Sequence, residues 1–224
     1  MRTRVKICCI SSVAEARAAV AAGADAIGLV SAMPSGPGVI DEALIANIAA
    51  AAPPALGTFL LTSETDPAAI VAQQRRCGVN TIQFCDALDA SAYPVLREAL
   101  PGIALIQVIH VRGEGGVAEA VGVAPMVDGL LLDSGNPTGT VKELGGTGRV
   151  HDWTLSHCIV ESAPCPVFLA GGLNAGNVAD AIHRVRPYGV DLCTGVRTDD
   201  ALDPAKLAAF MGAVAGADAC ARLP

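Results

Sequence analysis

The residues of this chain best suited to bind an anion lie in three turns that contain glycine. Glycine lets the backbone approach a ligand closely, and successive backbone N–H groups form a concavity that binds anions. Each turn alone is also compatible with an ordinary tight turn. In their order along the chain, the three turns predict a phosphate site that contains Gly146, Thr147, Gly148, Gly171, Gly172, Thr194 and Gly195.

Reactive side chains stand in two apolar runs. Asp133 closes the run Gly-Leu-Leu-Leu-Asp, where it is either a functional carboxylate or a cap that accepts backbone N–H bonds. In the run Val-Lys-Ile-Cys-Cys-Ile, strand alternation places Lys6 and Cys8 on one face and Cys9 on the other. We expect one thiol at the mouth of the fold and the other against a layer of helices. The alternative is two buried thiols without chemistry.

Short apolar runs alternate with helical patterns along the chain and must position these residues. The expected strands are Val5–Ile10, Ala26–Val30, Leu56–Leu61, Thr81–Phe84, Ala104–Val111, Gly129–Asp133, Val167–Gly171 and Val190–Gly195. Helical patterns include Val13–Ala22, Asp41–Ala51, Pro67–Arg76, Ala90–Leu100, Asn174–Arg184 and Pro204–Val214. This alternation predicts a closed barrel or an open doubly wound sheet. No Gly-x-Gly-x-x-Gly motif follows the first strand, which disfavours the dinucleotide-binding version of the open sheet.

We therefore predict an α/β fold, a single (β/α)8 TIM barrel over residues 1–224. In such a barrel the active site lies at the C-terminal ends of the strands, and phosphate commonly binds after strands 7 and 8. The longest irregular stretch runs from Asp133 to about Trp153. A loop of that length in a compact domain is usually functional or disordered.

Composition excludes several classes of protein. The chain is 52% hydrophobic but only 3% aromatic, which suits a barrel filled by aliphatic residues. No apolar run reaches the length of about 18 residues that a membrane helix needs, and the N-terminus lacks the pattern of a signal peptide. We expect a cytoplasmic protein without a membrane partner. The net charge of −7, with no basic cluster longer than Arg75–Arg76, argues against nucleic acid.

Eight cysteines are present, and none are spaced as Cys-x-x-Cys. In a chain of this length and apolar character they are not typical of a disulfide framework or a structural metal site. We expect free thiols in a reducing compartment, most of them small buried side chains, and no metal.

The motifs taken together resemble one known family. They are Lys6-Ile7-Cys8-Cys9-Ile10, Ala22-Gly23-Ala24-Asp25-Ala26-Ile27-Gly28, Leu131-Leu132-Asp133-Ser134, Gly145-Gly146-Thr147-Gly148 with Asp152-Trp153, Leu169-Ala170-Gly171-Gly172-Leu173 with Asn177-Val178, and Val190-Asp191 with Gly195-Val196. In this order they are similar to the phosphoribosylanthranilate isomerases of tryptophan biosynthesis, from about residue 4 to residue 212. The resemblance implies a phosphorylated sugar as substrate, no cofactor or metal, and a monomer or homodimer.

The resemblance also implies a reaction and two catalytic residues. The reaction is an Amadori rearrangement of an N-ribosyl amine phosphate to a 1-amino-1-deoxyribulose phosphate. By position, Asp133 would be the general acid that protonates the ribose ring oxygen, and Cys8 would be the base that removes the proton from C2. These roles require a raised pKa for the carboxyl and a lowered pKa for the thiol.

Several positions depart from the family pattern. Cys9 replaces a glycine, and Pro37 stands where the family usually has the arginine that binds the anthranilate carboxylate. Gln83-Phe84-Cys85-Asp86 replaces Gln-Leu-His-Gly, and Cys193-Thr194-Gly195-Val196-Arg197 replaces Ser-Ser-Gly-Val-Glu. Arg197, Arg112 or Arg149 is a candidate to bind the aglycone instead. Alternatively, each is a solvated surface charge, and His110 is a structural histidine.

Three other readings stay open. The same barrel could act on a different aglycone, as Pro37 suggests. It could be another phosphate-binding barrel, such as an epimerase or an aldolase, with Lys6 as the Schiff-base lysine of an aldolase. It could also be a non-catalytic protein that binds a phosphorylated metabolite.

Overall fold

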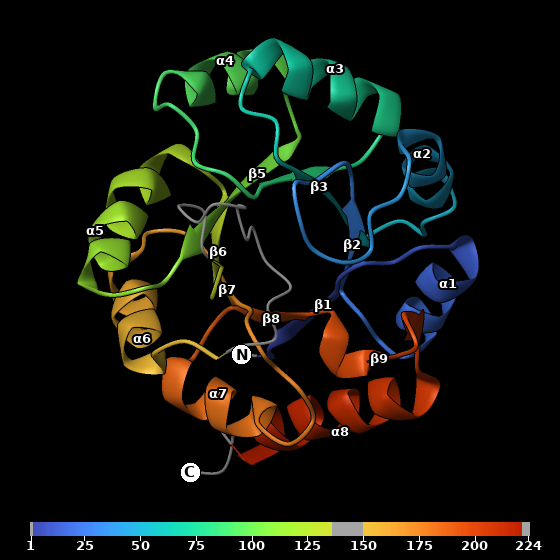
Figure 1. Cartoon of the computed structure of the whole chain (residues 1–224). Coiled ribbons are helices and arrows are strands. Elements are labelled where there is room, and N and C mark those ends of the chain that lie inside the picture. Colours follow the sequence, from blue (N-terminus) through green and yellow to red (C-terminus); the bar gives the residue numbers. More distant parts are fainter. Residues whose placement is uncertain (1, 136–149, 221–224) are drawn as a thin grey trace.

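Eight parallel strands close into a barrel surrounded by helices (Figure 1). The computed structural model describes residues 2–135 and 150–220. The strands are β1 (Arg4–Ile7), β2 (Ala26–Val30), β3 (Gly57–Thr62), β4 (Thr81–Phe84), β5 (Ala104–His110), β6 (Gly129–Asp133), β7 (Val167–Leu169) and β8 (Gly189–Leu192). Each strand pairs with the next, and β1 pairs with β8 to close the ring. The predicted TIM barrel is confirmed.

The helices form an outer ring around the strands (Figure 1). They are α1 (Val13–Ala21), α2 (Glu42–Ala50), α3 (Pro67–Cys77), α4 (Ala92–Ala99), α5 (Glu114–Val123), α6 (Trp153–Ser162), α7 (Val178–Val185) and α8 (Pro204–Cys220). Two 3-10 turns, η1 (Ala124–Met126) and η2 (Thr194–Val196), and a short hairpin of β9 (Arg197–Thr198) and β10 (Ala201–Leu202) complete the described elements. The hairpin lies in the segment that joins β8 to α8.

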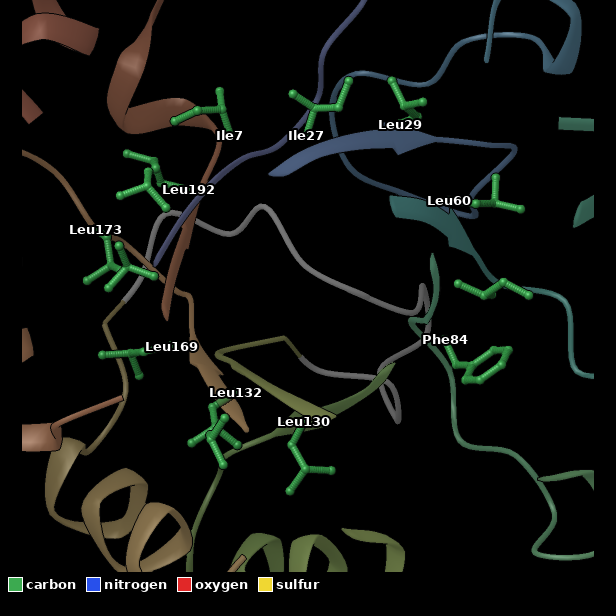
Figure 2. Packing of buried hydrophobic residues seen from close by; sticks show 14 of the residues in the cluster. Ile7, Ile27, Leu29, Leu60, Phe84, Leu130, Leu132, Leu169, Leu173 and Leu192 are labelled. Carbon is green, nitrogen blue, oxygen red and sulfur yellow. The ribbon is translucent and has the colours of Figure 1, made fainter. Parts of the chain in front are cut away.

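The core has two layers because every strand is buried on both faces. Outward-facing aliphatic side chains pack against the helices, and Figure 2 shows Ile7, Ile27, Leu130 and Leu192 among those that point away from the barrel axis. A second cluster fills the barrel itself and includes Ala26, Phe59, Ile106, Leu131 and Phe168. The interior of the barrel is therefore filled by side chains, as in other barrels of eight parallel strands.

Several element ends near the site differ from the expected ones. Strands β7 and β8 end at Leu169 and Leu192 rather than at Gly171 and Gly195. Strand β1 ends at Ile7, three residues before the expected end, because Cys9 adopts a left-handed conformation with φ of 61°. Helix α7 begins at Val178 rather than at Asn174. Asn174 instead forms a turn, in which its side chain accepts from the Gly176 N–H at 2.8 Å and its own N–H donates to the Asn177 side chain.

Across the described residues, no helix has both the length and the apolar character needed to span a membrane.

Candidate active site

A pocket of about 710 Å³, its open mouth included, lies at the C-terminal end of the barrel. Its walls come from the C-terminal ends of β2, β3, β4, β6 and β8 and from the segments that follow β1, β2, β4, β7 and β8. The lining residues are Cys8, Cys9, Val30, Met33, Ser35, Gly36, Pro37, Leu61, Gln83, Cys85, Asp133, Ala170, Gly171, Gly172, Leu173, Asp191, Leu192, Cys193 and Thr194.

A buried ion pair lies on the strands that carry this pocket. The Nζ atom of Lys6 lies 2.9 Å from a carboxylate oxygen of Asp191, and the Lys6 side chain has no solvent exposure. Burial alone would lower the Lys6 pKa, but the charge and hydrogen bond of Asp191 outweigh it and raise the pKa above its ordinary value. Gly28 makes room for this arrangement, because a Cβ there would lie 2.8 Å from the Cys8 Sγ and 3.0 Å from the Lys6 Nζ.

Cys8 is held in a setting that favours its thiolate. Its backbone N–H donates to the Leu192 carbonyl at 2.8 Å, which ties the end of β1 to β8. The hydrogen bond from the Cys9 thiol lowers the Cys8 pKa, burial opposes this, and the positive charge of Lys6 lowers it further. The net shift is downward from the ordinary thiol value. A buried thiol with a lowered pKa at the mouth of a barrel is suited to accept a proton.

Cys9 also faces the pocket, contrary to the expectation that it would lie against the helices. The alternation rule assumes an extended strand, but the left-handed backbone at Cys9 turns its side chain toward the same side as Cys8. The Cys9 Sγ lies 3.6 Å from the Pro37 carbonyl oxygen. Gly38 accommodates this turn, because a Cβ there would lie 2.4 Å from the Cβ of Cys9.

Asp133 reaches the pocket from the end of β6 and is 8% exposed. Burial raises its pKa above the ordinary carboxyl value. The N–H of Ser134, which donates to it at 2.7 Å, and the nearby His110 oppose that rise without cancelling it. The carboxyl is therefore placed to hold a proton at higher pH than a solvated aspartate, as a general acid requires.

The structure brings most of the described glycine turns to the pocket. Gly171 and Gly172 have φ of 86° and 64°, conformations that favour glycine, and both line the pocket together with Thr194. Gly195 packs beneath them, because a Cβ there would lie 2.2 Å from the Leu173 carbonyl oxygen. The three remaining residues of the predicted phosphate site, Gly146, Thr147 and Gly148, lie outside the described residues, as does Arg149.

Residues 5–213 match the model of the family described as N-(5'phosphoribosyl)anthranilate (PRA) isomerase. The chain belongs to this family. A relative from Dechloromonas aromatica, named N-(5'-phosphoribosyl)anthranilate isomerase, is 37% identical over 226 residues, which cover 97% of this chain and 99% of its own. A relative of the same name from Methanocella arvoryzae is 35% identical over 198 residues, which cover 88% of this chain and 90% of its own.

A solved structure extends the likeness to the fold. It is a phosphoribosyl anthranilate isomerase in complex with reduced 1-(o-carboxyphenylamino)-1-deoxyribulose 5-phosphate. It is 26% identical to this chain, with a TM-score of 0.76, and the match covers 96% of this chain and 99% of that one. The sequence-based assignment to the PRA isomerase family is thus confirmed.

Within this PRA isomerase barrel, neither described arginine candidate for the aglycone lines the pocket. The Arg197 guanidinium pairs with Glu15 at 2.8 Å and also donates to the carbonyl oxygens of Cys9 and Asp200. Glu15 in turn accepts from the N–H groups of Ser11 and Leu202. Arg197 therefore holds the loop that follows β1, since its donors are directed at that loop. Arg112 is exposed and follows β5 at the same end of the barrel.

The geometry also bears on Lys6 as a Schiff-base lysine. An aldolase lysine must be a neutral nucleophile, whereas Lys6 is buried in an ion pair that raises its pKa. Lys6 is therefore unsuited to form the Schiff base of an aldolase.

Sequence reasoning missed two functional positions. Asp191 was noted only as part of a motif, although a charged residue within the apolar run Gly-Val-Asp-Leu is itself a signal of a buried partner. Glu15 carries no such signal, because it stands in the first turn of α1, where acidic residues are common.

Proposed function

We propose that this chain catalyses the isomerisation of N-(5'-phosphoribosyl)anthranilate to 1-(o-carboxyphenylamino)-1-deoxyribulose 5-phosphate in tryptophan biosynthesis. The observation that carries the proposal is one pocket, at the mouth of a PRA isomerase barrel, lined by a thiol whose pKa is lowered and a carboxyl whose pKa is raised. These opposite shifts are the ones that a base and an acid need near neutral pH.

In the proposed mechanism, Asp133 donates its proton to the ribose ring oxygen. The bond between C1 and the ring oxygen breaks, and the anthranilate nitrogen supplies the electron pair that forms the protonated Schiff base. Cys8 as thiolate then removes the proton from C2, which gives an enolamine that tautomerises to the C2 ketone. Lys6 stays protonated throughout because Asp191 holds its charge, and its field stabilises the thiolate.

The substrate phosphate is proposed to bind at the turns that follow β7 and β8. Gly171 and Gly172 place their backbone at the pocket without a Cβ in the way, and Thr194 adds a hydroxyl at the same wall. Binding the phosphate here leaves the sugar to extend across the barrel mouth toward Cys8 and Asp133. The solved relative in complex with reduced 1-(o-carboxyphenylamino)-1-deoxyribulose 5-phosphate supports a phosphorylated open-chain sugar as occupant.

The decisive experiment is turnover of phosphoribosylanthranilate, followed by loss of substrate fluorescence. We expect kcat on the order of 1 per second or more. Cys8→Ala and Asp133→Asn should each lower kcat about 10²- to 10⁴-fold, the usual contribution of a positioned acid or base. Cys158→Ala, an exposed thiol on α6, is the matched control and should retain full turnover. Full activity in Cys8→Ala would exclude the assigned base.

A second candidate, a different aglycone, is favoured by one observation. Among the described residues that line the pocket, Met33, Ser35, Gly36 and Pro37 follow β2, and none of the lining residues is an arginine or a lysine. Comparing phosphoribosylanthranilate with the analogue that lacks the carboxylate tests this. A preference for the carboxylate in kcat/KM of about tenfold or more, worth about 1.4 kcal/mol, supports anthranilate; equal values support another aglycone.

A further inference from the structure

Three cysteine thiols meet where β1 and β8 close the barrel. Cys8 and Cys9 follow β1, and Cys193 follows β8. The two strands pair with Ile7 beside Leu192, so the next residue of each chain segment, Cys8 and Cys193, emerges at the same edge. The thiols of Cys8 and Cys193 both lie within hydrogen-bonding reach of the Cys9 thiol, and all three residues line the pocket. We call Cys8, Cys9 and Cys193 the thiol cluster.

Two members of the thiol cluster are departures from the pattern of the family. The family has glycine at the position of Cys9 and serine at that of Cys193. Cys9 has φ of 61°, a conformation that glycine adopts without strain and that a residue with a Cβ adopts only at a cost. The cysteine side chain is therefore present at a position that the backbone conformation disfavours. The proposed isomerisation needs only the thiolate of Cys8, which leaves a redox role open to the two added thiols.

We propose that the thiol cluster is an oxidative modification site, in which a hydroperoxide joins Cys9 and Cys193 in a disulfide across the seam between β1 and β8. The Cys8 thiolate first attacks the peroxide; an S–O bond forms, the O–O bond breaks and hydroxide leaves. The Cys9 sulfur then attacks the sulfenic acid, which forms a Cys8–Cys9 S–S bond and releases water. Finally the Cys193 sulfur attacks Cys9, Cys8 leaves as thiolate, and the Cys193 proton neutralises the hydroxide.

In these steps, two thiols and one molecule of hydrogen peroxide give one disulfide and two molecules of water. Cys8 is regenerated. Cys8 reacts first, because the thiolate is the nucleophile and the Cys8 pKa is lowered, whereas the neighbouring thiols and burial raise the pKa of Cys9.

Geometry selects the final pair. Consecutive Cα atoms lie about 3.8 Å apart, below the usual disulfide range of about 4.4–6.8 Å, so a bond between Cys8 and Cys9 is strained and exchanges readily. Cys193 follows the neighbouring strand, is not adjacent to Cys9 in the chain, and has its thiol within hydrogen-bonding reach of the Cys9 thiol, so these two sulfurs can be joined without that strain. Cys85 lines the same pocket but has its sulfur contacts with Gln83, so it stays a free thiol.

The disulfide removes the Cys9 S–H that donates to Cys8, so the modified protein has a weaker base. This consequence for turnover rests on the proposed function. The formation of the disulfide does not, because it needs only the thiols and a peroxide.

The test uses the reduced full-length protein, stoichiometric hydrogen peroxide, alkylation of the remaining thiols and mass spectrometry of the tryptic peptides. We expect residues 7–17 joined through Cys9 to residues 185–197, with Cys8, Cys85 and Cys158 alkylated and the link reversed by dithiothreitol. Cys9→Gly and Cys193→Ser, which restore the residues of the family pattern, should form no link. Cys158→Ser should form it as the wild type does, and Cys8→Ala at least about tenfold more slowly.

Two results would overturn the proposal. One is Cys9 and Cys193 both recovered as free thiols while Cys8 is oxidised to the sulfinic acid. The other is a link that forms equally fast in Cys8→Ala, which would remove Cys8 from the relay. Because both readouts are masses, they stand even if the protein fails to turn over phosphoribosylanthranilate.

Discussion

Replacing Lys6 with methionine would remove one partner of the buried ion pair and leave the Asp191 carboxylate without its cation. The pair has an N–O distance of 2.9 Å, with side-chain exposures of 0% for Lys6 and 7% for Asp191. Breaking a pair buried to this degree costs about 3–5 kcal/mol. The carboxyl can avoid part of that cost by taking up a proton. Protonating an ordinary carboxyl at pH 7 costs about 4 kcal/mol, which sets the upper limit.

That limit makes the cost depend on pH. In Lys6→Met the carboxyl of Asp191 has a raised pKa when folded and an ordinary one when unfolded, so the folded state binds more protons and loses stability as pH rises. We expect a loss of about 3–4 kcal/mol at pH 7 that falls to about 1.5 kcal/mol at pH 5. Lys6→Met with Asp191→Asn should recover most of the loss at pH 7.

Urea unfolding followed by circular dichroism measures these differences at both pH values. Lys206→Met is the matched control, because Lys206 is exposed on α8 and should change stability by less than about 1 kcal/mol. A loss in Lys6→Met no larger than that of Lys206→Met, or one that does not change between pH 5 and pH 7, would refute the reasoning about the buried pair.

Three further outcomes are expected from the geometry of the pocket. Gly28→Ala places a Cβ 2.8 Å from the Cys8 Sγ, so kcat should fall about tenfold or more. The free energy of unfolding, measured by thermal unfolding, should fall by only about 1–3 kcal/mol from overpacking. An unchanged kcat would show that the close contact between Gly28 and Cys8 does not matter for turnover. Gly195→Ala places a Cβ 2.2 Å from the Leu173 carbonyl oxygen, which must displace the turn. The Kd for inorganic phosphate, measured by calorimetry, should therefore rise about tenfold. An unaltered Kd would exclude this turn from the phosphate site. Cys9→Gly removes the donor that lowers the Cys8 pKa, so the rising limb of the kcat/KM profile should move to higher pH; a limb that stays in place would show that Cys9 does not tune Cys8.

The barrel was predictable because most of its strands are short apolar runs in the sequence. Runs such as Gly129–Asp133 and Ala26–Val30 are apolar on both faces, as only strands buried on both sides are, and the structure has these two strands at the predicted residues. Strand ends were less predictable. The end of β1 depends on the left-handed turn at Cys9, which no periodicity encodes, and the expected outward orientation of that thiol was wrong for this reason.

The sequence predicted the members of the candidate site that follow individual strands, but not the contacts between them. Cys8, Asp133 and the turns at Gly171 and Thr194 reach the pocket because each follows an apolar run, and the topology brings such ends together. The ion pairs of Lys6 and of Arg197 depend on which strands are neighbours after the ring closes. Arg197 shows this most clearly, since its partner Glu15 is 182 residues away.

The closure of the ring at β1 and β8 sets when the site comes into being during synthesis. Cys8 is among the first residues to leave the ribosome, yet its backbone partner Leu192, the Lys6 partner Asp191 and the Arg197 clamp on Cys9 all lie in the last fifth of the chain. Domains fold as their residues become available, from the N-terminus onward. A nascent chain that stops short of residue 191 lacks every one of these contacts and has no β8 to pair with the strand that precedes Cys8. The oldest part of the molecule therefore acquires its chemistry last, and a chain truncated within its final strand is expected to be inert however much of the barrel it has formed.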